Sequence, residues 1–521
     1  MRQSGLGDHE KGCLTCCFRW TGDLRCGNVV HVGRGGTPRP ATNSQSTKGN
    51  TVNQPLTLSN ETAAGGAFAT AAKSAAGYLD EAANAHGREK VQMVLDAIGR
   101  TRTASHLVEI GPGGGAALQC LTGSLTSTTD RPRPLDVTLI EAPGVISQSL
   151  AHAIDRYNAS DLGTCTLTHG LAQQIGTILD RPVDIVAASA LMHEVYSYGS
   201  GYRGIHELMC TLPAVLTPGG HFAYRDVRTV NAPTLHEPVT HTYTHRGWLQ
   251  FIRMFTPQYL TGSLHPYHRS GDDPTARQDS RRVALESIDP RTSAVVTGPI
   301  GLFREIQRHY ITFRDYAWRS GVLGFRPQLD GQLSADWIDA AAGHKRVHFT
   351  LTETEGVSSR HRTFLKSISE PYGDHYATDG DMFDECTDAA LIELLTSAEH
   401  GDDACASVWR EWTEREGHET YVYLTLSELL SEFAITSAEA NTNTVLMPRA
   451  ARDVRTPERA YYTRYLRTRL PNPLPDGKQM VLFTNIPAHD SQAISAGIET
   501  LRPLCSRPAM VRLHSALTHT M

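Results

Sequence analysis

Short apolar runs alternate with amphipathic stretches over the first half of the chain. Apolar residues dominate 106–110, 136–141, 183–188 and 221–227, and a weaker run covers 164–168. Runs of this length and composition predict strands that are buried on both faces. The stretches between the runs have helical patterning, at 88–98, 116–121, 144–157, 171–179 and 202–216. This alternation predicts an α/β fold with a parallel sheet covered by helices on both faces.

The alternation stops after residue 228. From 229 to 417 the helical stretches are separated by polar loops, and they lie at 248–260, 302–322 and 388–412. This part therefore predicts a separate, mainly helical unit.

Mixed α/β patterning returns near the end of the chain. A short amphipathic helix is predicted at 425–433, a strand at 434–440 and a final strand at 478–484. The end of the chain thus offers a helix–strand pair and one more strand.

The chain has 521 residues, which is more than a single hydrophobic core usually organises. Ordered structure is predicted from about residue 63, beginning with a helix at 67–79. The predicted units are a disordered extension at 1–62, the first part of an α/β core at 63–228, a mainly helical insertion at 229–417, the last helix and strands of that core at 418–490, and an appendage at 491–521.

The extension contains Cys13 and Cys16 at C-x-x-C spacing, with Cys17 and Cys26 nearby. Such a pair is compatible with a zinc site, but a second spaced pair is absent from this segment. The Gly-, Thr- and Ser-rich sequence at 33–55 favours a disordered extension instead.

Composition limits the classes of binding partner and the cellular compartment that are expected. The formal net charge is −6, which gives no general attraction to nucleic acid or to an anionic membrane. No apolar run approaches the roughly 20 residues that a membrane helix needs. The first 30 residues lack the apolar centre of a secretory signal, so a cytoplasmic location with reduced cysteines is expected.

The segment Glu109-Ile-Gly-Pro-Gly-Gly-Gly115 follows the first predicted strand and precedes a helix. Glycines at 111, 113 and 115 permit positive φ angles and let a ligand lie against the backbone. A helix N-terminus behind the loop suits an anionic or polar ligand. Glu141 ends the second predicted strand, where a carboxylate can accept hydrogen bonds from both hydroxyls of a ribose.

These residues resemble the first two cofactor motifs of the class I, Rossmann-like S-adenosylmethionine-dependent methyltransferases. The resemblance implies that the loop wraps the amino-acid part of the cofactor and that Glu141 binds its ribose. The residues implied for the loop are Glu109, Gly111, Gly113 and Gly115.

A dinucleotide-binding domain is the main competing interpretation, because Gly111 to Ala116 also satisfies G-x-G-x-x-A. Glu109, two residues before the first glycine, is usual in the methyltransferase loop and unusual in the dinucleotide one. The Pro-Gly-Gly turn at 218–220, which leads into the fifth strand, also resembles the methyltransferase pattern.

The segment that follows the fourth strand resembles the place where this family brings the cofactor sulfur to the acceptor. Ser189 is expected beside the cofactor, and His193 and Glu194 near the methyl-transfer centre. His193 is a candidate general base and Glu194 a candidate to orient or replace it. Packing or acceptor positioning by His193 is the alternative. Arg225 and Asp226 either face the same site or form an internal salt bridge.

Two further clusters have both a functional and a structural interpretation. His236, His241 and His245 match no trusted metal-ligand spacing, so a polar loop is expected and no metal site is assigned. An arginine-rich stretch at 449–469, interleaved with tyrosines, suits a phosphate-bearing acceptor or RNA. A solvated helix face is the favoured interpretation of that stretch.

The resemblance also implies a Rossmann-like sheet of seven strands. In this family a helix after the fifth strand leads to a sixth strand, and the seventh returns antiparallel. Nothing immediately after 227 supplies those elements, whereas 427–439 looks like that helix and sixth strand and 478–484 like the seventh, so the sheet is predicted to be split by the insertion at 229–417. The alternative is two consecutive domains, with a truncated sheet that ends near 227 and an independent C-terminal half. An insertion leaving from the carboxyl end of the fifth strand would stand over the cofactor as a lid and acceptor chamber.

The expected function is methyl transfer from S-adenosyl-L-methionine to an oxygen, nitrogen or carbon of a small-molecule or carrier-bound acceptor. A nicotinamide-dependent oxidoreductase and a non-catalytic scaffold with the same fold are the alternatives. Membrane and nucleic-acid partners are not expected, and a homodimer is compatible with the sequence.

Overall fold

The computed structural model describes residues 86–101, 103–127, 134–262, 277–278, 294–329, 346–353, 356–454 and 457–520. All of them belong to the compact unit Leu58–Met521. The predicted extension at 1–62, its cysteines and the predicted helix at 67–79 lie outside the described residues.

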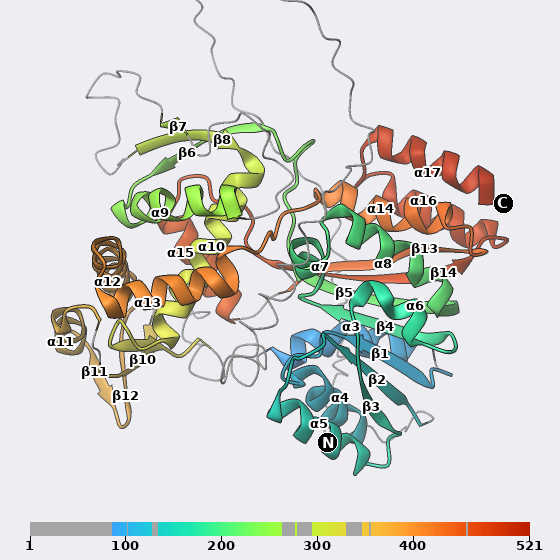
Figure 1. The fold of residues 1–521 in the computed structure, drawn as a ribbon, viewed down its shortest axis with the longest axis horizontal. Coiled ribbons are helices and arrows are strands. Elements are labelled where there is room, and N and C mark those ends of the chain that lie inside the picture. The colour runs from blue at the N-terminus through green and yellow to red at the C-terminus, as the bar shows by residue number, and fades with distance from the viewer. Residues whose placement is uncertain are drawn as a thin grey trace, which may run out of the picture. The chain divides into compact units, whose positions relative to one another are not determined.

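The centre of the fold is a seven-stranded sheet with the order β13-β14-β5-β4-β1-β2-β3 (Figure 1). Five neighbouring strands are parallel, and they are β1 (His106–Ile110), β2 (Asp136–Glu141), β3 (Cys165–His169), β4 (Val183–Ser189) and β5 (Leu216–Val227). The other two, β13 (Thr444–Asp453) and β14 (Lys478–Pro487), pair antiparallel with each other, and β14 pairs antiparallel with β5. The five strands expected from the apolar runs are present.

Helices cover both faces of this sheet. Successive strand residues point to opposite sides, so each face contributes side chains to one helical layer. Leu107 packs with one layer and Val108 with the other. The first layer contains α3 (Gly87–Arg100), α4 (Ala116–Thr126) and α5 (Gln148–Asn158). The second contains α6 (Ile175–Ile178), α7 (Met192–Tyr198), α8 (Tyr202–Val215) and α14 (Leu426–Glu439). The predicted α/β architecture is confirmed.

The sheet is split in sequence, as predicted. Lys478 pairs with Val227 and Thr484 with His221 in antiparallel register. The Arg228 amide donates to the Gly477 carbonyl at 2.8 Å, so the two ends of the long excursion meet. Strand β14 therefore pairs with β5, a strand that ends about 250 residues earlier in the chain.

The predicted position of the sixth strand is wrong. Residues 434–439 continue α14, and the strand is β13 instead. A capping box between Thr425 and Glu428 starts the helix. Its second half is buried almost all round, which removes the amphipathic period that identifies a surface helix. Asn441 and Asn443 then take left-handed φ angles of 52° and 62° and turn the chain into β13.

The excursion between β5 and α14 forms an accessory unit that is mainly helical, as predicted. Its helices are α9 (Arg246–Gly262), α10 (Ile300–Arg319), α11 (Ser359–Ser367), α12 (Gly380–His400), α13 (Asp403–Trp412) and the π-helix η5 (Thr413–Gly417). Aromatic side chains fill its core, among them Trp248, Phe251, Tyr310, Phe313 and Trp412.

The accessory unit also contains two small antiparallel sheets that the hydrophobic pattern did not indicate. One has the order β6-β8-β7, with β6 (Pro238–Tyr243), β8 (Ala294–Pro299) and β7 (Arg277–Gln278). The other has the order β11-β12-β10-β9, with β11 (Glu370–Tyr372), β12 (His375–Asp379), β10 (Arg346–Leu351) and β9 (Phe325–Pro327). The prediction of a mainly helical unit placed no strands here, so these two sheets are an addition to it.

The chain enters the accessory unit a second time between β13 and β14. Helix α15 (Pro457–Arg469) buries Tyr461, Tyr462 and Tyr465 in the accessory core. The predicted assignment of all of 418–490 to the sheet core is thus corrected, since α15 packs in the accessory unit.

The end of the chain is part of the core rather than an appendage. Helices α16 (Ser491–Leu501) and α17 (Arg507–Thr520) place Ile494, Leu501 and Leu513 in the hydrophobic layer above the sheet. Ile494, Ile498 and Leu501 recur at helical spacing, so the sequence contained a core-facing stripe that the predicted appendage overlooked. Among the described helices, none combines the length and apolarity that crossing a membrane requires.

Candidate functional site

The loop between β1 and α4 has the backbone that its glycines predict. Gly111, Gly113 and Gly115 have φ angles of 69°, 56° and 79°. A side chain at Gly115 would also meet Ala153 and Leu150, because an added Cβ would lie 3.0 Å and 3.1 Å from their nearest atoms. The loop therefore depends on glycine both for its backbone angles and for its packing.

Glu141, at the end of β2, lies against this loop. One carboxylate oxygen accepts a hydrogen bond from the Gly113 amide at 3.1 Å, and the other accepts from the Ala142 amide at 2.8 Å. The side chain is buried, so the carboxylate is held at one position beside the glycines. The two segments that the sequence analysis assigned to one ligand are in direct contact.

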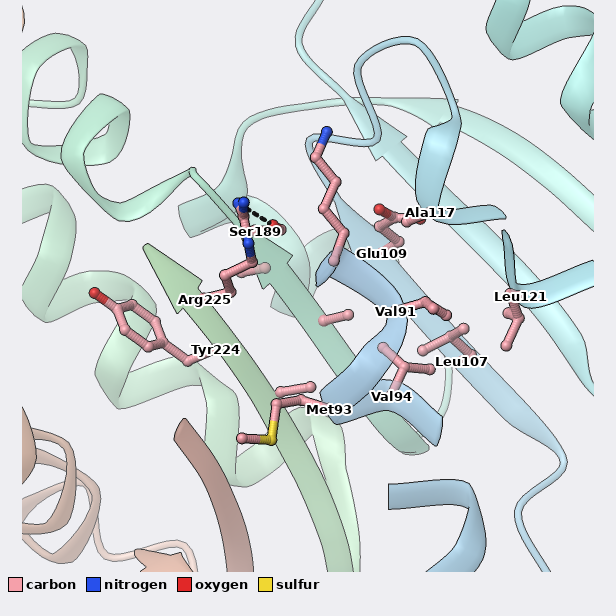
Figure 2. A pocket seen from close by; sticks show the side chains of 14 residues that line it. Val91, Met93, Val94, Leu107, Glu109, Ala117, Leu121, Ser189, Tyr224 and Arg225 are labelled. Carbon is pink, nitrogen blue, oxygen red and sulfur yellow. Dashed lines mark hydrogen bonds between the residues drawn. The ribbon is translucent and has the colours of Figure 1, made fainter. Parts of the chain in front are cut away.

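A pocket lies between α3 and the sheet, and side chains of both line it (Figure 2). Its polar lining consists of Lys90, Glu109, Ser189 and Arg225. Burial raises the pKa of Glu109 to about 7, although the charge of Lys90 acts in the opposite direction. Burial, and then the charge of Arg225, lower the pKa of Lys90 to about 8. The pocket thus holds an acid and an amine whose pKa values both lie near neutral pH.

Arg225 joins three elements at the edge of this pocket. Its guanidinium donates to Ser189 Oγ at 3.0 Å, as Figure 2 shows, and forms a buried ion pair with Glu89 of α3. Of the two interpretations of Arg225, the internal salt bridge is present, and the same side chain also lines the pocket.

His193 lies at the beginning of α7, just beyond the carboxyl end of β4. Ala190 makes the turn between them with a φ of 56°, an unusual value for a residue with a Cβ. The His193 ring contacts Asp226 through Nδ1 at 2.8 Å, and the His193 amide donates to the same carboxylate at 3.2 Å. Asp226 is fully buried, so it fixes the orientation of the ring.

The other ring nitrogen of His193 faces a second acid. Nε2 lies 3.5 Å from a carboxylate oxygen of Glu419, a buried residue from the segment between η5 and α14. The Tyr198 hydroxyl donates to the other oxygen of Glu419 at 3.3 Å. Glu194 completes the group, since one ligand-type atom from each of His193, Glu194 and Glu419 lies within 4.8 Å of the others.

The surroundings of His193 determine its protonation. Burial by itself lowers the pKa of His193, but the charge and hydrogen bond of Asp226, together with those of Glu419, outweigh burial and raise it well above its usual value. Both ring nitrogens face carboxylates, which suits His193 to positioning. Its role as a general base stays a prediction.

No protein-family model matches this chain, and no curated protein matches it. An arsenic(III) S-adenosylmethionine methyltransferase from Chlamydomonas reinhardtii matches at 17% identity and a TM-score of 0.19, over 24% of this chain and 39% of that one. The N-methyltransferase NodS from Bradyrhizobium japonicum matches at 16% and 0.21, over 27% and 67%. An O-methyltransferase family protein from Burkholderia thailandensis matches at 17% and 0.23, over 42% and 59%. This chain thus covers less than two thirds of two of these three proteins.

The strand order and the glycine loop of this chain, rather than these similarities, identify its architecture. Strand β14 runs antiparallel between β5 and β13, which are parallel to each other, at one side of an otherwise parallel sheet. The fold is that of the class I methyltransferases. In this methyltransferase fold, the loop after β1, Glu141 and the residues after β4 all lie where the sequence analysis expected them, at the carboxyl ends of the parallel strands.

Two residues of the candidate site were missed by sequence reasoning. Lys90 follows Glu89 in an ordinary amphipathic helix, and nothing in that pattern distinguishes it from a surface lysine. Glu419 lies more than 220 residues after His193 and belongs to no motif. Only the three-dimensional fold brings Glu419 to the histidine.

The other clusters have structural roles. His241 lies in β6 and stacks on Phe303 with the ring centres 4.5 Å apart, and burial lowers its pKa to about 4. Arg464 and Arg469 of α15 form ion pairs with Asp384 and Asp388 of α12. The favoured interpretation of the arginine-rich stretch as a solvated helix face is therefore wrong for these two residues, because both tie α15 into the accessory unit.

Proposed function

We propose that this protein is an S-adenosylmethionine-dependent methyltransferase that acts on a small-molecule or carrier-bound acceptor. The observation that carries the proposal is the contact between Glu141 and the amide of Gly113 in a loop of three positive-φ glycines. It places a fixed carboxylate beside open backbone, which suits a ribose next to an amino-acid chain.

The charges of the adjacent pocket support the same cofactor. S-adenosylmethionine ends in an ammonium and a carboxylate, and the pocket offers Glu109 and Lys90 as their opposites. Burial disfavours the charged form of both groups. A zwitterionic ligand whose charges pair with each group would offset that cost. A dinucleotide has no ammonium for Glu109 and would bring a pyrophosphate instead.

The acceptor is proposed to lie beside Glu194 and Glu419, at the carboxyl ends of β4 and β5. The segment that carries Glu419 is held from both units: the Thr420 amide donates to Ser197 of α7 at 2.7 Å, and the Val422 amide to Glu305 of α10 at 2.7 Å. The accessory unit thereby forms one wall of the site, which excludes water and aligns the acceptor with the methyl group. Glu194, rather than His193, is the group proposed to contact the acceptor.

Calorimetry on the full chain tests the proposal. We expect S-adenosylmethionine and S-adenosylhomocysteine to bind and NAD not to bind. Gly113→Val should abolish binding without unfolding the chain, because a branched side chain is strained at positive φ and fills the space along the loop. Binding of NAD alone would overturn the proposal, and binding of the methyl donor without turnover on any acceptor would favour a scaffold.

A further inference from the structure

We infer that His193, Glu194 and Glu419 form a binding site for one divalent transition-metal ion. Within the described part of the chain, this is the single group of three or more His, Cys, Asp or Glu residues whose ligand-type atoms converge, all within 4.8 Å of one another. One imidazole and two carboxylates are a donor set that Mn²⁺ and Zn²⁺ accept. The inference concerns these side chains alone and does not depend on the proposed methyl transfer.

The orientation of His193 is that of a metal ligand. Its Nδ1 contacts a buried carboxylate, Asp226, at 2.8 Å, and ligating histidines usually donate their second ring N–H to such a group. Nε2 is left facing Glu419 at 3.5 Å. Two ligand atoms bound at ordinary lengths to one tetrahedral ion lie roughly 3.4 Å apart. The His193–Glu419 separation is close to this value.

The balance of charge also favours a cation. Three carboxylates, those of Asp226, Glu419 and Glu194, surround one imidazole, and the first two are almost completely buried. Like charges that share a site with little solvent repel strongly unless a cation lies among them. An imidazolium supplies one positive charge and Lys90 acts electrostatically on Glu194, whereas a divalent ion bound to the neutral imidazole supplies two charges at the ligand atoms themselves.

The site is held rigidly in place. The His193 amide is anchored on Asp226, and Tyr198 of the same helix donates to Glu419 at 3.3 Å. Thr420 is fixed on Ser197, so the segment with Glu419 cannot slide along α7. Three protein ligands leave coordination positions open, which is typical of ions that also bind a substrate oxygen or water. The site lies beside the wall formed by the accessory unit, a position that would allow the ion to bind a substrate oxygen.

Titration of the chelator-treated full chain with Mn²⁺, followed by the loss of the free-ion electron paramagnetic resonance signal, tests the inference. Mn²⁺ is chosen because it prefers oxygen and nitrogen ligands to the thiolates that the N-terminal cysteines offer. We expect one bound ion per chain, and at least a tenfold loss of affinity in Glu419→Gln and in Glu194→Gln. Glu414→Gln, at an exposed acid of the preceding π-helix η5, is the matched control and should bind like the parent.

Thermal unfolding of each variant shows whether it is folded. If Glu419→Gln does not fold, Glu194→Gln decides, because that side chain is only half-buried and tolerates the change. The inference is overturned if the parent binds no stoichiometric Mn²⁺. Undiminished binding in the folded Glu194→Gln or Glu419→Gln variant overturns it equally.

Discussion

Removal of the Glu141 carboxylate should weaken cofactor binding without disturbing the fold. That carboxylate is already fixed by two backbone amides, so the fold does not have to rearrange when a ribose arrives. Glu141→Ala is expected to weaken S-adenosylmethionine by about 1–3 kcal/mol, the usual effect of losing charge-assisted hydrogen bonds. Calorimetry measures the change, with the exposed Glu207→Ala of α8 as control. An affinity within about twofold of the parent, well below that range, would place the ribose elsewhere.

Glu109 should make cofactor binding depend on pH. Burial raises its pKa to about 7 in the free protein, and a cofactor ammonium pairs only with the ionised form. Affinity is therefore expected to rise with pH over the range below about 7, by up to roughly tenfold per pH unit. Above about 8 it should fall again, because Lys90 loses the charge that pairs with the cofactor carboxylate.

The matched control for this pH dependence is Glu109→Gln. The amide has the same shape and does not titrate, so its affinity should be lower and nearly constant over the same range below about pH 7. A parent profile that is flat, or that has the same slope as the Gln variant, would show that Glu109 does not face the cofactor.

Site residues that lie close together in the sequence could be predicted, whereas residues that meet only through tertiary packing could not. The positive-φ glycines, Glu109 and Glu141 fall within one strand–loop–helix–strand unit, so their meeting follows from the connection alone. Asp226 was recognised as facing the site or bridging internally, but its partner was unknown. Glu419 reaches His193 only through the packing of two units, and no periodicity along the chain encodes that contact.

At the scale of elements, the start of α14 depends on one buried threonine. Thr425 accepts a hydrogen bond from the Glu428 amide, and its own amide donates to the Glu428 carboxylate at 2.7 Å. Thr425→Ala should lower the free energy of unfolding by about 1 kcal/mol, as for other lost N-caps. Chemical denaturation measures this, and Thr500→Ala on the exposed side of α16 should change it by less than about 0.5 kcal/mol. Equal effects would contradict a capping role.

The accuracy of the predicted elements follows from how each one is buried. Strands β1, β2, β4 and β5 lie inside the parallel sheet, so their apolar runs stand out against polar turns. The strands of the accessory sheets are short and pair over long separations, as β6 does with β8, and their half-exposed residues leave no clear period. The end of α14 is the opposite case, because complete burial makes a helix resemble an apolar strand.

At the scale of the molecule, a buried charge network fixes α15 in the accessory unit. Asp384 of α12 accepts hydrogen bonds from Arg314 at 2.7 Å and from the Tyr461 hydroxyl at 2.6 Å. Asp384→Ala should reduce the free energy of unfolding by about 3–5 kcal/mol, because Arg314 would remain buried with a main partner removed. Chemical denaturation gives the value.

A surface ion pair in the same unit is the matched control for this network. Glu399 pairs with Arg253 between α12 and α9, but both side chains are exposed. Glu399→Ala should therefore cost no more than about 1 kcal/mol. If the two variants lose similar stability, the Asp384 network does not contribute through burial.

The meeting of β5 with β14 has a consequence for synthesis on the ribosome. The paired residues Val227 and Lys478 are about 250 positions apart in the chain. At roughly 5–20 residues per second, β5 leaves the ribosome about 10–50 s before its neighbour exists. During that interval the nascent chain exposes an unpaired strand edge, which invites pairing with other chains. The cofactor-binding half is thus expected to need chaperone protection until the last third of the protein has emerged, and ribosome-bound chains that end before β14 should be sensitive to protease throughout that half.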